Sequence, residues 1–238
     1  MVLALKIASS LVSSQEAKQN IYSLNFNGTD ESVTVDSVSS SINTSRGTIS
    51  FWAKTGTMSS TGTYFRALTD AENHIIIIYH ASSNQVRVAY KGGGANKTAV
   101  ISDAIENDGK WHHIAATWSS ESDELKIYLD GTLKATTTGL STYEGAIASS
   151  SIGNNTAGAN FINATLTDVA IFNTVVPISQ IYVANQQPVN LTGMTGLVGY
   201  WRFDSGSGSV AIDSSGKGFN GTLVNTPTWS TDVPYKAN

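Results

Sequence analysis

The chain of 238 residues contains no cysteine. This absence excludes disulfide bonds, thiolate metal sites and a cysteine nucleophile. Charged residues are also scarce: they make up 13% of the chain, about half of the roughly 25% that is usual in globular proteins. Lysine and arginine together number 14, and aspartate and glutamate number 18, which gives a net charge of −4. Because phosphate binding requires clustered cations, this composition argues against a nucleic-acid partner.

Apolar stretches of the kind that enter membranes are also missing. The first stretch, MVLALKIASSLV, is largely apolar, but Lys6 interrupts it and no charged segment precedes it, as an export signal requires. The four isoleucines at 75–78 are far fewer than the roughly 20 apolar residues of a membrane-spanning helix. We therefore predict no membrane insertion and no export by the usual secretory route.

The chain does contain many short runs in which apolar and polar residues alternate, separated by turn-forming residues. Alternation with a period of two is typical of strands that bury one face. The pattern predicts an all-β protein. The expected strands lie near 22–26, 31–35, 47–53, 63–69, 74–80, 85–91, 97–102, 111–118, 124–130, 132–138, 148–153, 161–172, 196–203 and 219–224.

The segment 111–131, WHHIAATWSSESDELKIYLDG, shows the pattern most clearly. It predicts two consecutive antiparallel strands followed by a hairpin turn at Asp130-Gly131. Adjacent residues of a strand point to opposite faces, so His112 and His113 cannot both bind one metal ion. We expect His112 to be a hydrogen-bonding residue on the core side.

Several motifs occur in a fixed order along the chain. They are LNFNGTDESVTV at 24–35, GTISFWAK at 47–54, WHHIAATW at 111–118, IYLDG at 127–131, SIGNN at 151–155, FINATLTDVAIFNTVVP at 161–177 and LVGYWRFDSGSGSVAIDSSGKGFNGTLVN at 197–225. With this order and spacing, the chain resembles the laminin-G-like, concanavalin A-like jelly rolls that include the pentraxins, over about residues 24–230. The resemblance implies an antiparallel two-sheet jelly-roll sandwich at 23–238. Its last strands are expected from 196–230, in a permuted arrangement.

One short helix and one terminal arm are expected outside the strands. From Pro177 onward, Ile181 and Tyr182 follow a helical spacing until Pro188 ends it. We predict that this helix closes one end of the sandwich. Residues 1–22 do not resemble the rest of the chain and are predicted to form an N-terminal arm that docks onto another protein.

Calcium is the one cofactor that the sequence and the resemblance suggest. Hard cations bind carboxylate and carbonyl oxygens from loops. Asp213 and Asn220 in the DSSGKGFNG loop would approach Asp168 if the C-terminal segment packs beside residues 161–172. Similar positions in the family often hold calcium, so Asp168, Asp213 and Asn220 are candidate metal ligands. The alternative is that Asp213 only caps the turn.

The aromatic residues divide into two groups by position. Those in strand motifs are expected in the core: Trp52, Trp111, Trp118 and Trp201. Those near loops are candidates for stacking on a sugar ring: Tyr64, Tyr143, Phe161 and Trp229.

Catalytic residues are not expected. A glycosidase of this architecture needs two facing carboxylates, but Glu121, Asp123 and Glu124 fall in a hairpin turn, which we expect to be solvated. No serine lies in a nucleophile-elbow motif. The sequence therefore predicts a protein that is not an enzyme.

The function that we predict is a non-enzymatic, lectin-like surface module. The start at Met1, the lack of an export signal and the N-terminal arm favour a phage virion structural or decoration protein, with glycans and other virion proteins as its partners. The alternatives are a secreted bacterial carbohydrate-binding or adhesion module, outside the cell or on its surface, and a glycoside hydrolase. A homo-oligomer is left open.

Overall fold

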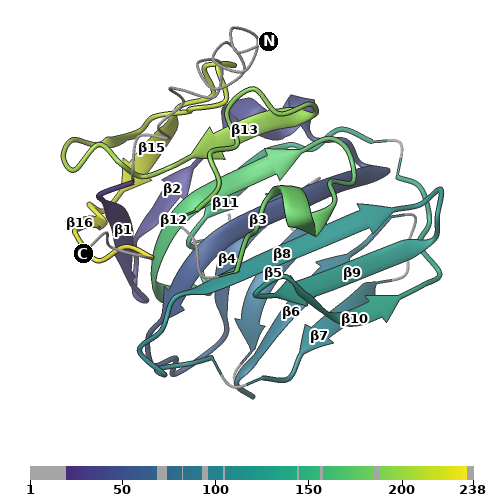
Figure 1. Ribbon diagram of the computed structural model, residues 1–238, viewed down its shortest axis with the longest axis horizontal. Helices are drawn as coiled ribbons and strands as arrows, with labels where there is room; N and C mark the ends of the chain where they lie inside the picture. The colour runs from purple at the N-terminus through teal and green to yellow at the C-terminus, as the bar shows by residue number, and fades with distance from the viewer. Residues whose placement is uncertain are drawn as a thin grey trace, which may run out of the picture.

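The computed structural model describes residues 20–68, 74–81, 83–92, 96–103, 105–143, 145–155, 158–184 and 188–234. It consists of two antiparallel sheets of eight strands each, packed face to face (Figure 1). The predicted all-β sandwich is therefore confirmed. Within the described ranges, no helix has the length and apolar character needed to cross a membrane.

Sheet A has the strand order β10-β9-β8-β3-β12-β1-β16, and β13 also pairs with β12. Its strands are β1 (Ser23–Asn27), β3 (Arg46–Thr55), β8 (His112–Ser119), β9 (Glu124–Leu129), β10 (Thr132–Thr137), β12 (Asn163–Phe172), β13 (Leu197–Trp201) and β16 (Thr228–Ser230). Sheet B has the order β14-β15-β2-β11-β4-β5-β6-β7. Its strands are β2 (Ser32–Thr34), β4 (Gly62–Leu68), β5 (His74–Ala81), β6 (Gln85–Tyr90), β7 (Lys97–Ile101), β11 (Ser149–Ile152), β14 (Val210–Ala211) and β15 (Gly221–Val224).

Every strand expected from the sequence is present, with ends within two residues of the prediction. The short strands β14 and β16 were not predicted, because two or three residues are too few to show an alternation. The last strands of the chain lie beside the first in both sheets: β16 pairs with β1 and β15 pairs with β2. The C-terminal segment therefore contributes to both sheets.

The main core lies between the sheets and contains large, fully buried aromatic side chains. Trp118 and Trp201 belong to it, as predicted. Gly47 pairs with Trp118 across β3 and β8, and a Cβ atom at this glycine would lie 2.3 Å from the indole ring. The prediction for Trp111 is wrong: this residue precedes β8, is only partly buried, and donates its indole N–H to Asp232.

A second apolar cluster covers the outer face of sheet A. It forms where Ile181 and Leu191 pack onto outward-facing residues of β8, β12 and β13, including Phe172 and Tyr200. The fourth predicted core tryptophan, Trp52, is buried on this outer face and not between the sheets.

The predicted helix after Pro177 is a single 3-10 turn, η2 (Ile178–Gln180). It lies across the outer face of sheet A (Figure 1) and does not close an end of the sandwich. The turn lies on this face because the two residues that follow it contact sheet A. Ile181 packs into the second apolar cluster, and Tyr182 stacks on His113. A second 3-10 helix, η1 (Asp36–Ser41), was not predicted. Residues 1–19 of the predicted N-terminal arm lie outside the described residues, which begin at Asn20. The boundary of the arm near residue 22 stays a prediction.

The paired histidines lie on opposite faces of β8, as strand alternation requires. His112 bonds to Asp130 at 2.7 Å and to Asp108 at 2.9 Å, so its predicted hydrogen-bonding role is confirmed at the end of the strand. The hydrogen bond to Asp130 raises the pKa of His112. His113 is buried under Tyr182, and burial lowers its pKa to about 4.

The buried His113 should make the protein less stable in mild acid. The unfolded state binds a proton near pH 6.5, whereas the folded state resists protonation down to about pH 4. We expect the free energy of unfolding to fall by about 2 kcal/mol between about pH 7 and about pH 4.5 because of this residue. His113→Phe should remove most of that loss, as measured by urea unfolding at both pH values.

The neighbouring His112 provides a control of opposite sign. Its raised pKa stabilises the fold below about pH 6.5, and this contribution disappears as the pH rises through the folded-state value. His112→Gln should therefore lower stability more in acid than at about pH 8. Identical pH profiles for the two variants would contradict the assignment.

Candidate functional site

The two sheets differ in how their outer faces are used. The outer face of sheet A is covered over its middle by the second apolar cluster. On sheet B, outward-facing residues of β5 and β6 such as Ile77, Tyr79 and Arg87 remain partly exposed. A hollow of about 270 Å³ lies on this face. We call it the sheet B hollow, and it is lined by Thr61, Thr63, Arg66, Ile77, Tyr79, Ala89, Asn96, Asn155 and Asn160.

The bottom of the sheet B hollow is formed by residues that pair across β4, β5 and β6. Arg66 of β4 pairs with Ile77 of β5, which pairs with Ala89 of β6. Thr63 and Tyr79 form the next pair of β4 and β5 on the same face, beyond the bulge in β4. Successive residues of a strand point to opposite faces, so these side chains face outward while Ile76 and Ile78 enter the main core. Because the side chain of Ala89 is small, the hollow is deep at this position.

The rim of the sheet B hollow is polar. Asn155 forms a backbone bridge with Ala159, the residue before Asn160. Asn96 leads into β7, and Thr61 leads into β4. Carboxamides supply both donors and acceptors, and a hydroxyl does the same. The rim can therefore bind the alternating donors and acceptors of a polyhydroxylated molecule around the ring of Tyr79.

Two of the side chains that line this hollow contain a buried polar atom that has no hydrogen-bond partner among the described residues, Thr63 Oγ1 and Arg66 Nε. Other buried atoms of this kind, such as Nδ1 of His80 and of His113, lie outside the lining of the hollow. Buried polar atoms in folded proteins are almost always paired, because leaving one unpaired costs about 1–3 kcal/mol. A ligand in the hollow that reached these two atoms would therefore offset this cost.

A larger hollow of about 660 Å³ lies at the ends of β3, β12 and β13, between Arg46 and Lys217. Arg46 is within 3.9 Å of Glu121 and is largely exposed. Among the described residues that line this hollow, none has a buried side-chain nitrogen or oxygen without a partner. The lining of this larger hollow is therefore typical of a solvated surface.

The predicted calcium ligands lie near one another but bind protein donors. Asp168 is buried in β12, where it accepts the Tyr200 hydroxyl at 2.5 Å and the Asn20 amide at 3.1 Å. Asp213 accepts the backbone N–H of Tyr200 at 3.0 Å, so the two carboxylates lie at opposite ends of this tyrosine. Asn220 accepts the backbone N–H of Asp213 at 2.9 Å.

The Asp213 carboxylate organises its own loop. Its two oxygens also accept the N–H and the hydroxyl of Ser215 and the N–H of Phe219, each within 2.9 Å. Donors of this kind occupy the lone pairs that a cation would need. Among the described residues, no group of three or more His, Cys, Asp or Glu residues is arranged to hold a metal ion. The calcium site at Asp168, Asp213 and Asn220 stays a prediction, and the arrangement favours the turn-capping alternative.

The aromatic residue that lines the sheet B hollow was not among those predicted. Tyr64 is fully buried, because a bulge in β4 turns both Tyr64 and Phe65 toward the core. The other three candidates are partly buried outside the hollow: Tyr143, Phe161 and Trp229. Tyr79 was overlooked because it ends the apolar run IIIIY. Its alternation with Ile76 and Ile78 was the available signal.

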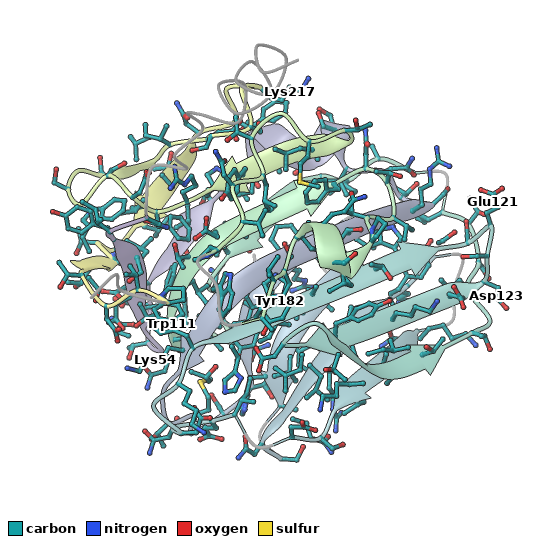
Figure 2. The ribbon with its side chains drawn as sticks, in the orientation of Figure 1. Lys54, Trp111, Glu121, Asp123, Tyr182 and Lys217 are labelled. Atoms are coloured by element: carbon teal, nitrogen blue, oxygen red, sulfur yellow. The ribbon has the colours of Figure 1, made fainter. Side chains whose placement is uncertain are left out.

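Two of the three acidic residues, Glu121 and Asp123, lie in the turn between β8 and β9, as predicted, whereas Glu124 is the first residue of β9. Glu121 is exposed, and Asp123 accepts the backbone N–H groups of Gly139 and Leu140 at 2.6 Å. Glu124 binds Lys126 at 2.6 Å. The turn lies at one end of the molecule, far across the view from Trp111 (Figure 2).

Comparison with known proteins places these features in a family. Residues 27–182 match the family model of the concanavalin A-like lectin/glucanases superfamily. A stretch of 95 residues is 34% identical to the sushi, von Willebrand factor type A, EGF and pentraxin domain-containing protein 1 of Mus musculus, covering 40% of this chain and 2% of that protein. The chain thus corresponds to a small part of this relative. The predicted resemblance to laminin-G-like and concanavalin A-like jelly rolls is confirmed.

Two solved structures share the fold. A Bacteroides ovatus protein, described as carbohydrate-binding, superimposes with a TM-score of 0.68 at 18% identity, covering 92% of this chain and 62% of that chain. The CBM40 module of a Ruminococcus gnavus sialidase, bound to α2,3-sialyllactose, superimposes with a TM-score of 0.53 at 14% identity, covering 68% of this chain and 96% of that one.

The role of Asp213 can be tested by thermal unfolding. Because its carboxylate accepts four hydrogen bonds, Asp213→Ala should destabilise the protein by about 2 kcal/mol. For a chain of this size, this corresponds to a fall in Tm of about 4–8 °C. We expect the same fall with and without millimolar calcium. A rise in Tm with calcium in the wild type that disappears in Asp213→Ala would establish the calcium site instead.

Proposed function

Because the chain belongs to the concanavalin A-like lectin/glucanase superfamily, we propose that it is a glycan-binding module and that the sheet B hollow binds the glycan. The observation that carries this proposal is the set of buried, unpaired polar atoms beside a partly exposed tyrosine. A sugar ring has an apolar face that suits the ring of Tyr79, and its hydroxyls can both donate and accept hydrogen bonds.

The size of the hollow indicates what it can hold. Its volume of about 270 Å³ is near the lower end of the roughly 300–1,000 Å³ of small-molecule pockets. We infer that it takes one or two sugar residues at a time, such as the end or a branch of a glycan. The described carbohydrate-binding role of the Bacteroides ovatus structure and the sialyllactose bound to the Ruminococcus gnavus module support a glycan as the ligand class.

Binding without hydrolysis is the form of the function that we propose. A glycosidase needs two carboxyl groups on either side of the bond that is cleaved. The described residues that line the sheet B hollow include amides, hydroxyls and one cation but no carboxylate.

The setting in which the module works stays a prediction from the sequence. A virion surface is the leading proposal, with the extracellular space or a bacterial cell surface as the alternative. Mass spectrometry of purified particles and of the culture supernatant would distinguish the two. We expect the protein in the particles, and its presence only in the supernatant would contradict the virion proposal.

Mutation of Tyr79 tests the proposed site. Once a glycan array has identified a bound glycan, Tyr79→Ala should weaken binding at least about tenfold, equivalent to about 1.4 kcal/mol. Tyr79→Phe keeps the ring and should retain most of the affinity. Isothermal titration calorimetry measures both effects.

A tyrosine on the other sheet provides the matched control. Tyr128 of β9 is partly buried against the second apolar cluster on the outer face of sheet A. Tyr128→Ala should leave the glycan affinity unchanged. The proposed site is wrong if this variant loses binding while Tyr79→Ala retains it, and the proposed function is wrong if no glycan binds the wild-type protein.

A further inference from the structure

Arg66 is the charged residue that lines the sheet B hollow, and it lacks a counter-ion. Arg66 is only 7% exposed to solvent. No hydrogen bond or ion pair joins its guanidinium group to a residue in the described ranges, and its Nε is buried without a partner. Burial alone lowers the pKa of Arg66, but an arginine side chain remains charged at any physiological pH.

Each of the other three arginines of the chain has an ion-pair or a hydrogen-bond partner. Arg46 lies 3.9 Å from Glu121, and Arg202 lies 3.4 Å from Asp204. Arg87, on the same face of sheet B, donates twice to Gln85 Oε1, at 3.2 and 2.7 Å. A buried charge without a partner is costly, so proteins normally pair it. Arg66 has no such partner among the described residues, and it lines the hollow that we propose as the glycan site.

The chemistry of the hollow specifies the missing partner. A guanidinium group presents parallel N–H donors that match two oxygens of one anion. Thr63, which precedes Arg66 on the same face of β4, has a further buried hydroxyl without a partner among the described residues. Since the described residues that line the hollow contribute one positive charge and no negative charge, a ligand with a single anionic group balances the site.

We propose that the sheet B hollow selects an acidic sugar, one that carries a single carboxylate or sulfate group, and that Arg66 binds this anionic group directly. The inference rests on the proposed glycan-binding function and specifies its ligand class. Tyr79 then contacts the apolar face of the sugar ring, and the asparagines at the rim bind its hydroxyls.

Calorimetric titration with sialyllactose, sulfated lactose and lactose tests the proposal. The wild-type protein should bind at least one of the two acidic sugars at least about tenfold more tightly than lactose. Whichever acidic sugar is preferred identifies the anionic group. Arg66→Met should abolish the preference for the acidic sugar. Arg66→Lys should restore part of the preference, because it keeps the charge but not the paired donors.

Two measurements separate a ligand-binding role from a structural one. Without ligand, Arg66→Met should have the same Tm as the wild type or a higher one, because it removes a buried charge that no described protein group balances. Arg87→Met removes a charge from the same face and should keep the preference for the acidic sugar. A large fall in Tm for Arg66→Met, or a preference that survives this mutation, would overturn the proposal.

Failure of the inference can be told apart from failure of the proposed function. If the wild-type protein binds lactose as tightly as both acidic sugars, and Tyr79→Ala weakens that binding, the module binds glycans but does not select acidic ones. If the wild-type protein binds none of the three sugars and no glycan on an array, the glycan-binding function fails as well.

Discussion

The sandwich depends on the way in which Asp168 joins β12 to β13 and to the residues before β1. The first half of β12 pairs with β1 and the second half pairs with β13, on the same edge of the strand. Asp168 lies between these halves, at a bulge, with a φ of 53°. Its carboxylate accepts the Tyr200 hydroxyl from β13 and the Asn20 amide from the residues before β1. Burial raises the pKa of this carboxylate, and the hydrogen bonds from Tyr200 and Asn20 oppose that rise by stabilising its charged form.

The same junction explains how the end of the chain completes the fold. Tyr200 binds Asp168 through its hydroxyl and Asp213 through its backbone N–H, so one residue of β13 connects the β12 bulge to the C-terminal loop. From that loop the chain continues into β15, beside β2, and then into β16, beside β1. The two aspartates that family resemblance suggested as calcium ligands thus have an architectural use that requires no cation.

Much of the fold could be predicted from the sequence, because alternation is a local property that strand pairing preserves. The segment 111–131 forms the two strands and the Asp130-Gly131 turn that its pattern indicates, with positive φ at both turn residues. The predictions that failed depend on tertiary contacts. The bulge that buries Tyr64 and the cluster that holds Tyr182 against His113 leave no signature in the neighbouring sequence. The sheet B hollow was not predicted for the same reason, since its lining comes from separate strands and loops.

The contrast between the aspartates and Arg66 is the strongest physical argument for the location of the site. Asp168 and Asp213 are almost fully buried, and protein donors reach all four of their carboxylate oxygens. A chain that satisfies its buried anions so completely has the means to satisfy a buried cation, because a single acidic side chain near Arg66 would suffice. Instead, the described residues leave Arg66 Nε and Thr63 Oγ1 unpaired in one hollow on the open face of sheet B. Under the proposed function, a ligand that pairs these atoms would recover the stability given up there, because ligand binding adds to the stability of the folded state.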